Sequence, residues 1–197
     1  MAFNEEKLIK WSGILAACGT MTLAITALIT VAVTLNAWKV QREAARPYLS
    51  LMESPKVEVQ SGLSFEFKFS NVGVHPAVNL SSQTLVFNQN LTDPPIHNDQ
   101  YDLVNEIPKD MPASLVIALD TQEVDVSQPN IKPYYIVVYM SYADPLIDRL
   151  YHQTLYYKWN GIEAGTVQPV VHIEMREKER ISEYLKTLQI NPESRSG

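Results

Sequence analysis

The sequence has 197 residues and a formal net charge of −6, which leaves room for about one domain beside a shorter segment. Residues 47–197 carry 11 basic and 19 acidic residues, a net of −8, and this acidity excludes the basic surface that binds nucleic acid, so no nucleic-acid partner is predicted. The single cysteine, Cys18, excludes an internal disulfide.

An N-terminal tail, residues 1–10, precedes a run without charged residues from Trp11 to Trp38. A helix needs about 20 apolar residues to cross a hydrocarbon core about 30 Å thick. The two Trp residues would lie about 40 Å apart at ~1.5 Å per residue, which places both indoles in the interfacial zones that they prefer. The run predicts an uncleaved transmembrane helix over residues 11–38. It is too long for the core of a signal peptide, and a helix in a soluble core would keep a polar face.

The basic residues that flank this run bear on its orientation. Lys7 and Lys10 precede it, and Lys39, Arg42 and Arg46 follow it. Flanking Lys and Arg stay on the cytoplasmic side. The count narrowly favours a single-pass protein of the cell membrane with a cytoplasmic domain, and an extracytoplasmic domain is the alternative.

Four threonines recur at every fourth position of the run: Thr22, Thr26, Thr30 and Thr34. This spacing places them on one helix face. Hydroxyl and small residues let helices approach closely in lipid, so the face predicts a homo-oligomer formed through the transmembrane helix. The alternative is that each hydroxyl bonds only the carbonyl one turn back.

Residues 39–46 predict a helical linker that Pro47 ends, and residues 47–171 predict an antiparallel β-sandwich. The clearest strand is 63–70, where Leu and three Phe alternate with polar residues. The stretch 88–112 predicts a surface loop. Further strands are predicted at 48–51, near Val57 and Val59, and at 77–80, 83–87, 114–119, 134–142, 150–159 and 167–171.

The stretch 172–190 predicts a C-terminal amphipathic helix, followed by a tail over 191–197. Ile181, Tyr184, Leu185 and Leu188 form one apolar stripe at helical spacing. We expect the stripe to pack on the β domain, and a partner or second subunit is the alternative.

Residues 71–79, just after the clearest strand, read N-x-G-x-x-P-A-x-N, and Ala45-Arg46-Pro47-Tyr48-Leu49 follows the helix. With the aromatic stretch 151–159, this combination resembles a set of uncharacterised bacterial single-pass membrane proteins. The resemblance implies an immunoglobulin-like sandwich over roughly residues 40–160 and no catalytic residue. We interpret Asn71 and Gly73 as a turn and Pro76 as the start of an edge strand. The chain departs from the pattern at 144–146, where a glycine-bearing turn is expected.

Known catalytic and metal-binding patterns are missing from the sequence. There is no GxSxG, P-loop, GxGxxG or HExxH motif, and the histidines at 75, 97, 152 and 172 lack metal-ligand spacing. We therefore predict no enzyme activity, no cofactor and no metal.

Aromatic residues are dense between positions 134 and 159, and outward-facing Tyr and Trp side chains often bind protein partners. The candidates for such a surface are Tyr135, Tyr139, Tyr151, Tyr157 and Trp159. The alternative is a core with ordinary cross-strand aromatic pairs.

The sequence thus predicts a membrane-anchored interaction or sensing module with the bilayer and an unknown protein as partners. The alternatives are an extracytoplasmic envelope protein that binds a ligand or aids assembly, an effector that damages the membrane, and an enzyme.

Overall fold

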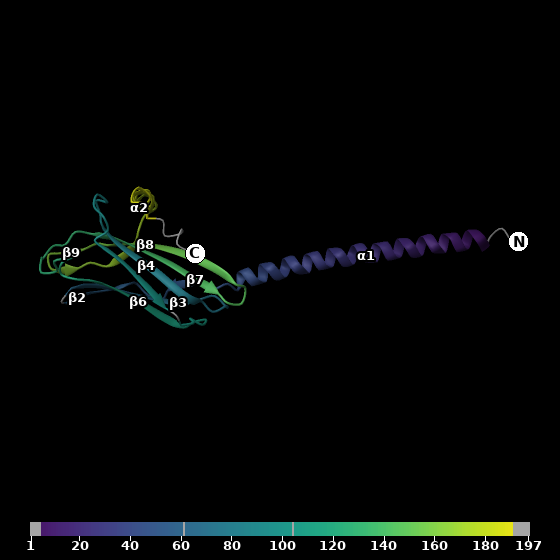
Figure 1. Cartoon of the computed structure of the whole chain (residues 1–197), viewed down its shortest axis with the longest axis horizontal. Coiled ribbons are helices and arrows are strands. Elements are labelled where there is room, and N and C mark those ends of the chain that lie inside the picture. The colour runs from purple at the N-terminus through teal and green to yellow at the C-terminus, as the bar shows by residue number, and fades with distance from the viewer. Residues whose placement is uncertain (1–4, 61, 104, 191–197) are drawn as a thin grey trace. The chain divides into compact units, whose positions relative to one another are not determined.

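The computed structural model describes residues 5–60, 62–103 and 105–190 (Figure 1). The chain divides into two compact units, residues 1–45 and residues 46–197, and each is described by itself.

The first unit contains α1, Glu5–Ala44, a continuous helix of 40 residues. Within it, Ile9–Ala44 is the helix among the described residues that is long and apolar enough to cross a membrane, with a mean hydropathy of 2.1. A signal sequence near an N-terminus can also meet this criterion of helix length and hydropathy. The helix continues through residues 39–44 and ends before Pro47, as the geometry of a residue preceding proline favours.

The second unit consists of two main antiparallel sheets. In the first sheet, β3 (Leu63–Asn71) pairs along one edge with β1 (Leu49–Leu51) and β2 (Lys56–Val59), and along the other with β6 (Pro112–Leu119). The second sheet has the order β11-β8-β7-β4-β5. Its strands are β4 (Val78–Asn88), β5 (His97–Leu103), β7 (Tyr134–Asp144), β8 (Arg149–Trp159) and β11 (Val170–His172), and a small hairpin joins β9 (Ile162–Glu163) to β10 (Thr166–Val167).

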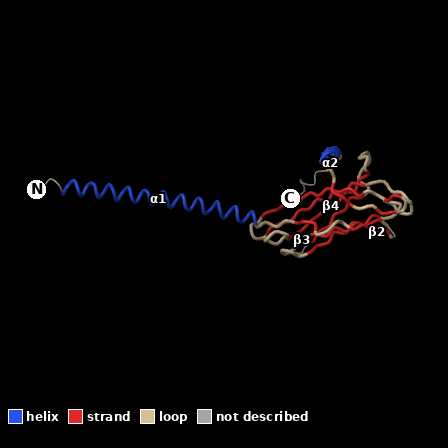
Figure 2. Tube along the Cα trace, turned by 180° about the vertical axis from the view of Figure 1, so that it is seen from behind, coloured by secondary structure: helices blue, strands red, loops and turns tan. Residues whose placement is uncertain are grey.

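The two sheets form two layers, as Figure 2 shows, and their facing side chains form one core. The alternation in β3 buries its Leu and three Phe and leaves its Ser, Glu and Lys partly exposed. Phe65 packs edge-on against Trp159 of the opposite sheet at 5.5 Å between ring centroids, and Phe67 packs on Tyr157 at 5.1 Å. Burying each such side chain contributes about 1.5–3 kcal/mol, so these contacts hold the layers together.

The second helix, α2 (Met175–Thr187), covers part of the outer face of the second sheet. Its buried Ile181 and Leu185 pack against Phe87, Tyr135 and Val137. The predicted stripe therefore packs on its own domain. These features confirm a mainly β fold with antiparallel sheets, a long apolar N-terminal helix and a C-terminal helix.

Four boundaries differ from the prediction. The stretch 88–112 contains β5, and the two strands predicted within 77–87 form the single strand β4. A register shift between Val78 and Ser81 marks the place where β4 is irregular. Residues 170–172 form β11, so α2 begins at Met175 and not at His172. Residues 5–10 of the predicted N-terminal tail belong to α1. Residues 1–4 and the predicted tail 191–197 lie outside the described residues.

Candidate functional site

Four connecting segments meet at one end of the β domain, and we call them the loop cluster. They are residues 46–48 before β1, 71–77 between β3 and β4, 107–111 before β6, and 144–149 between β7 and β8. The strand registers bring them together, because Leu49 pairs with Asn71, Ser70 with Pro112, and Val78 with Ala143.

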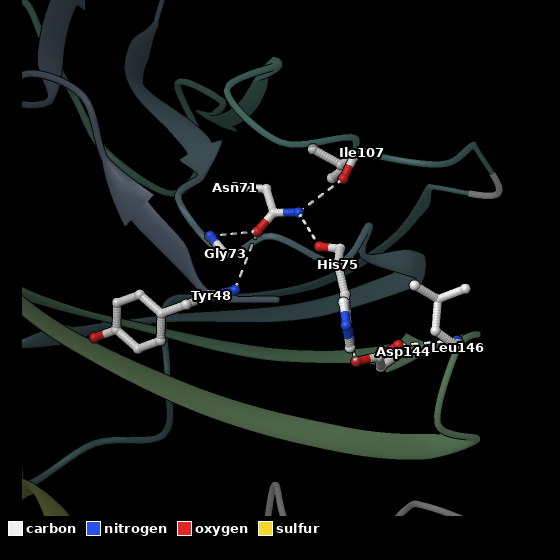
Figure 3. Close-up of polar contacts among 7 residues, drawn as sticks. All are labelled: Tyr48, Asn71, Gly73, His75, Ile107, Asp144 and Leu146. Atoms are coloured by element: carbon white, nitrogen blue, oxygen red, sulfur yellow. Dashed lines mark hydrogen bonds and ion pairs between the residues drawn. The ribbon is translucent and has the colours of Figure 1, made fainter. Parts of the chain in front are cut away.

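Asn71 lies at the centre of the loop cluster and is fully buried (Figure 3). Its Oδ1 accepts hydrogen bonds from the backbone N–H groups of Tyr48 at 3.1 Å and Gly73 at 3.0 Å. Its Nδ2 donates to the backbone carbonyls of His75 at 2.7 Å and Ile107 at 3.1 Å. An amide offers two donors and two lone pairs, so one side chain ties three segments together with all of its capacity used.

Gly73 is required by the close approach of the chain that enters the domain. A Cβ on Gly73 would lie 2.1 Å from the carbonyl oxygen of Arg46 and 2.7 Å from the Cα of Pro47. Backbone atoms cannot move aside as a flexible side chain could, so only glycine fits here.

Two further positions of the N-x-G-x-x-P-A-x-N pattern, Ala77 and Asn79, also have structural roles. Ala77 is buried and exchanges backbone hydrogen bonds of 3.0 and 2.8 Å with Ile107. Asn79 has φ of 54°, a left-handed conformation that asparagine tolerates, and it lies at the irregularity of β4. The interpretation of Pro76 as the start of an edge strand is wrong, because β4 lies between β7 and β5.

His75 and Asp144 join two of the loops. His75 Nδ1 lies 2.7 Å from Asp144 Oδ2, and the Asp144 side chain is fully buried. The other carboxylate oxygen of Asp144 accepts a hydrogen bond of 2.9 Å from the N–H of Leu146. Asp148 has φ of 50°. The Asp144 carboxylate and the left-handed backbone of Asp148 thus form the turn for which a glycine was expected at 144–146.

The chemistry open to the loop cluster is limited by these bonds. An Asp–His pair can orient an imidazole for proton transfer, but among the described residues no hydroxyl or thiol is hydrogen-bonded to His75. Across all the described residues, no group of three His, Cys, Asp or Glu side chains is arranged to hold a metal ion. The polar groups of the loop cluster hold its segments together.

The five aromatic residues predicted to form an exposed surface are not exposed in the structure. Tyr135, Tyr139, Tyr157 and Trp159 are buried, and Tyr151 is half-buried, so the prediction of an exposed surface is corrected. Tyr157 and Trp159 face the opposite sheet, where burial raises the pKa of the Tyr157 phenol to about 12. Cross-strand pairs are present, as Tyr134 stacks on Trp159.

The outer face of the second sheet carries polar pairs for which the sequence offers no motif. Tyr139 Oη lies 2.5 Å from His152 Nδ1, and Gln83 donates to Asn98 at 2.9 Å. Beside α2, Glu177 accepts from the Tyr135 hydroxyl and the Lys158 ammonium, both at 2.9 Å. Their side chains come together only through sheet pairing and helix packing.

The four threonines lie on α1, and their hydroxyls donate to the carbonyl four residues earlier at 2.8–2.9 Å. This bonding uses the donor of each hydroxyl and leaves both of its acceptor lone pairs. Hydroxyls bonded in this way can still face a neighbouring helix.

Comparisons with known proteins identify the family of this chain. No curated protein matches the chain. Among solved structures, the X-ray structure of the Northeast Structural Genomics Consortium target SoR45 matches with 12% identity over 67% of this chain and 93% of that one. Its TM-score of 0.33 is too low to assign a fold. A family described as a domain of unknown function, DUF8453, matches residues 11–163, which include the apolar run and most of the β domain. The chain belongs to this family.

Proposed function

We propose that the chain is a single-pass membrane protein in which α1 anchors an immunoglobulin-like β-sandwich beside the bilayer. The observation that carries this proposal is the charge-free run from Trp11 to Trp38, on a helix in which the described side chains from Ile9 to Ala44 are not buried. The two facing antiparallel sheets support the immunoglobulin-like fold.

The sandwich acts as a non-enzymatic interaction or sensing module. In the loop cluster, Asn71 bonds to neighbouring backbone groups, and Asp144 bonds to the His75 side chain and the N–H of Leu146. These bonds hold the loops together, which supports a role without catalysis. An anchored domain meets its partners at the raised effective concentration that confinement to a membrane gives. Its expected partners are the lipid bilayer, a protein neighbour in the same membrane and a second copy of the chain.

The anchor is tested by fractionating cells that express the full chain. We expect the protein in the membrane pellet after an alkaline carbonate wash, with an intact mass that includes the apolar run. A soluble product, or a mass that lacks the first residues, would contradict the anchor.

The side of the membrane is tested by reporters fused after Gly197. A reporter active only in the cytoplasm would agree with the narrow excess of basic residues after the run. A reporter active only outside would instead favour an envelope protein that binds a ligand or aids assembly.

Self-association is expected to use the threonine face of α1. Replacing both Thr26 and Thr30 with Leu should weaken the signal in a membrane two-hybrid assay several-fold, because bulky Leu side chains keep helices apart. Replacing both Ala24 and Ala32 with Leu is the matched control, because these two small residues lie on the side of the helix opposite Thr26 and Thr30. Equal signals from both variants would rule out this face.

A further inference from the structure

Half of the exposed large apolar side chains in the described part of the β domain, six of twelve, lie at the loop cluster. Five lie in its segments or directly beside them, and the sixth follows the 144–149 turn. They are Tyr48, Val72, Val74, Met111, Leu146 and Leu150, with exposed fractions between 45% and 63%. In the described loops at the opposite end, residues 89–96, 120–133 and 160–169, the exposed large apolar side chain is Val167. The other exposed large apolar side chains of the described β domain, Met52, Tyr101, Val116, Val171 and Met175, lie along or directly beside strands, or at the start of α2. A group of six exposed apolar side chains at one end of a domain marks a contact surface.

Hydrogen bonds hold the backbone of the loops that carry these apolar side chains. Val72 and Val74 flank Gly73, whose N–H is held by Asn71. Leu146 is held through its own N–H by Asp144, and Asp144 is held by His75. The ends of the loops are therefore fixed relative to one another, and their exposed side chains form one surface.

Charge separates this end from the rest of the domain. The loop cluster contains three basic residues, Arg46, Lys109 and Arg149, and three acidic ones, Asp110, Asp144 and Asp148. Its formal charge is thus zero, whereas residues 46–197, with 12 basic and 19 acidic residues, carry −7. The acidic excess, which anionic lipid headgroups would repel, lies elsewhere on the domain.

The chain itself indicates what covers this surface. Helix α1 ends at Ala44, and two residues later Arg46 begins the first segment of the loop cluster. From Trp38 to Ala44 the helix rises only about 9 Å, at ~1.5 Å per residue. A bilayer that holds the apolar run is thus tied by a short length of chain to the end of the domain with the exposed apolar side chains.

We propose that the loop cluster is a lipid-binding surface, which places Val72, Val74, Leu146 and Met111 at the boundary between headgroups and acyl chains. Shallow insertion of about 5–10 Å is typical of such contacts. The surface gives the β domain a second attachment and fixes which of its faces point away from the membrane. This inference rests on the proposed membrane anchor.

The test uses the full chain, with Cys18→Ser, in vesicles of phosphatidylcholine and phosphatidylglycerol. Single cysteines at Val74 or Leu146 carry an environment-sensitive NBD probe, and lipids with a shallow doxyl group act as quenchers. The matched control sites are Val116 and Val167, which are exposed valines outside the loop cluster. We expect blue-shifted emission and at least twofold stronger quenching at positions 74 and 146 than at the controls.

A probe at Leu28, inside α1, separates the inference from its premise. Quenching at position 28 by a deep doxyl group, with none at 74 and 146, would overturn the lipid-binding surface and leave the anchor standing. No quenching at position 28 would overturn the anchor and the inference together. A blue shift at 74 and 146 without lipid quenching would indicate contact with a second copy and would overturn the assignment to lipid.

A second variant tests the surface without a probe on the changed residues. Val74→Asp combined with Leu146→Asp should reduce the lipid quenching of a probe at Met111 at least twofold, because carboxylates resist burial among acyl chains. Val116→Asp, which adds a charge at an equally exposed valine, should leave the quenching unchanged. Undiminished quenching in the double variant would overturn the inference.

Discussion

Asn71 shows how one buried amide can organise a set of loops. Its four hydrogen bonds reach backbone groups of residues 48, 73, 75 and 107. An aspartate would lose both donors and bury a charge, and a glutamine would displace the amide by one methylene. The residue type is thus fixed by the number and direction of its partners.

Asn71→Ala should lower the free energy of unfolding by about 3 kcal/mol, because it leaves buried donors and acceptors without partners. The measurement is urea unfolding in detergent, followed by the fluorescence of the protein. Asn90→Ala is the control, since Asn90 is exposed and its loss should cost less than about 0.5 kcal/mol. Equal costs for the two variants would contradict the central role of Asn71.

Gly73 and Gly165 offer a comparison between a steric and a conformational requirement. Gly165 has φ of 77° with open space around its Cβ position, whereas Gly73 would place a Cβ 2.1 Å from a carbonyl oxygen. Gly165→Ala should cost about 1–2 kcal/mol through backbone strain alone. Gly73→Ala should cost more in the same urea titration, because β1 must separate from β3. The reverse order would show that the chain near Arg46 can move aside.

The sequence drew attention to the right residues around Asn71 but could not show what they do. A turn was predicted at 71–73 from residue types, and the four-fold hydrogen bonding was missed because one partner is 36 residues away. Asp144 lies 69 residues from His75, and no local pattern links them.

At the scale of elements, alternation was a good guide where one face is buried. It predicted the strand at 63–70, which the structure extends by one residue as β3. It missed β5, whose residues HNDQYDL are polar and mostly exposed because this strand lies at a sheet edge. Alternation also placed Tyr135 and Tyr139 on the outer face of their strand. It could not show that these side chains would be buried there, Tyr135 by contact with α2.

The contact between α2 and the second sheet depends on the ionised form of Glu177. Burial opposes ionisation of its carboxyl, but hydrogen bonds from Lys158, the backbone of Glu174 and Tyr135 outweigh this effect and lower the pKa below the ordinary 4.5. A depressed folded-state pKa stabilises the fold above the unfolded value, and the contribution is lost as the pH falls through the folded value.

Glu177→Gln should therefore reduce the free energy of unfolding by about 1–2 kcal/mol at pH 7, and this difference from the wild type should shrink as the pH falls below 4.5. Urea titrations of both proteins at pH 7 and pH 3 provide the measurement. Glu179→Gln, an exposed position on the same helix, should match the wild type at both values. A difference for Glu177→Gln that persists at pH 3 would contradict the role of its charge.

On the scale of the whole molecule, the fold separates the chain into two units at residues 45 and 46, whereas the family match spans both of them. The family covers residues 11–163 and so unites the apolar run with the β domain, while α2 at 175–187 lies beyond it. The pairing of run and domain is thus a property of the family. In this chain α2 adds a cover over Phe87, Tyr135 and Val137.

Two charges at the centre of α1 test whether that run holds the protein in lipid. At a membrane centre each Arg costs about 2.5–3.5 kcal/mol, so Ile25→Arg with Leu28→Arg should oppose insertion by roughly 5–7 kcal/mol. Most of the double variant should then leave the carbonate-washed pellet. Val40→Arg with Gln41→Arg adds the same two residues just beyond Trp38, where they can reach the headgroups, and it should stay in the pellet. If both variants remain in the pellet to the same extent, the apolar run is not what binds the membrane, and the contact would have to lie in the β domain itself.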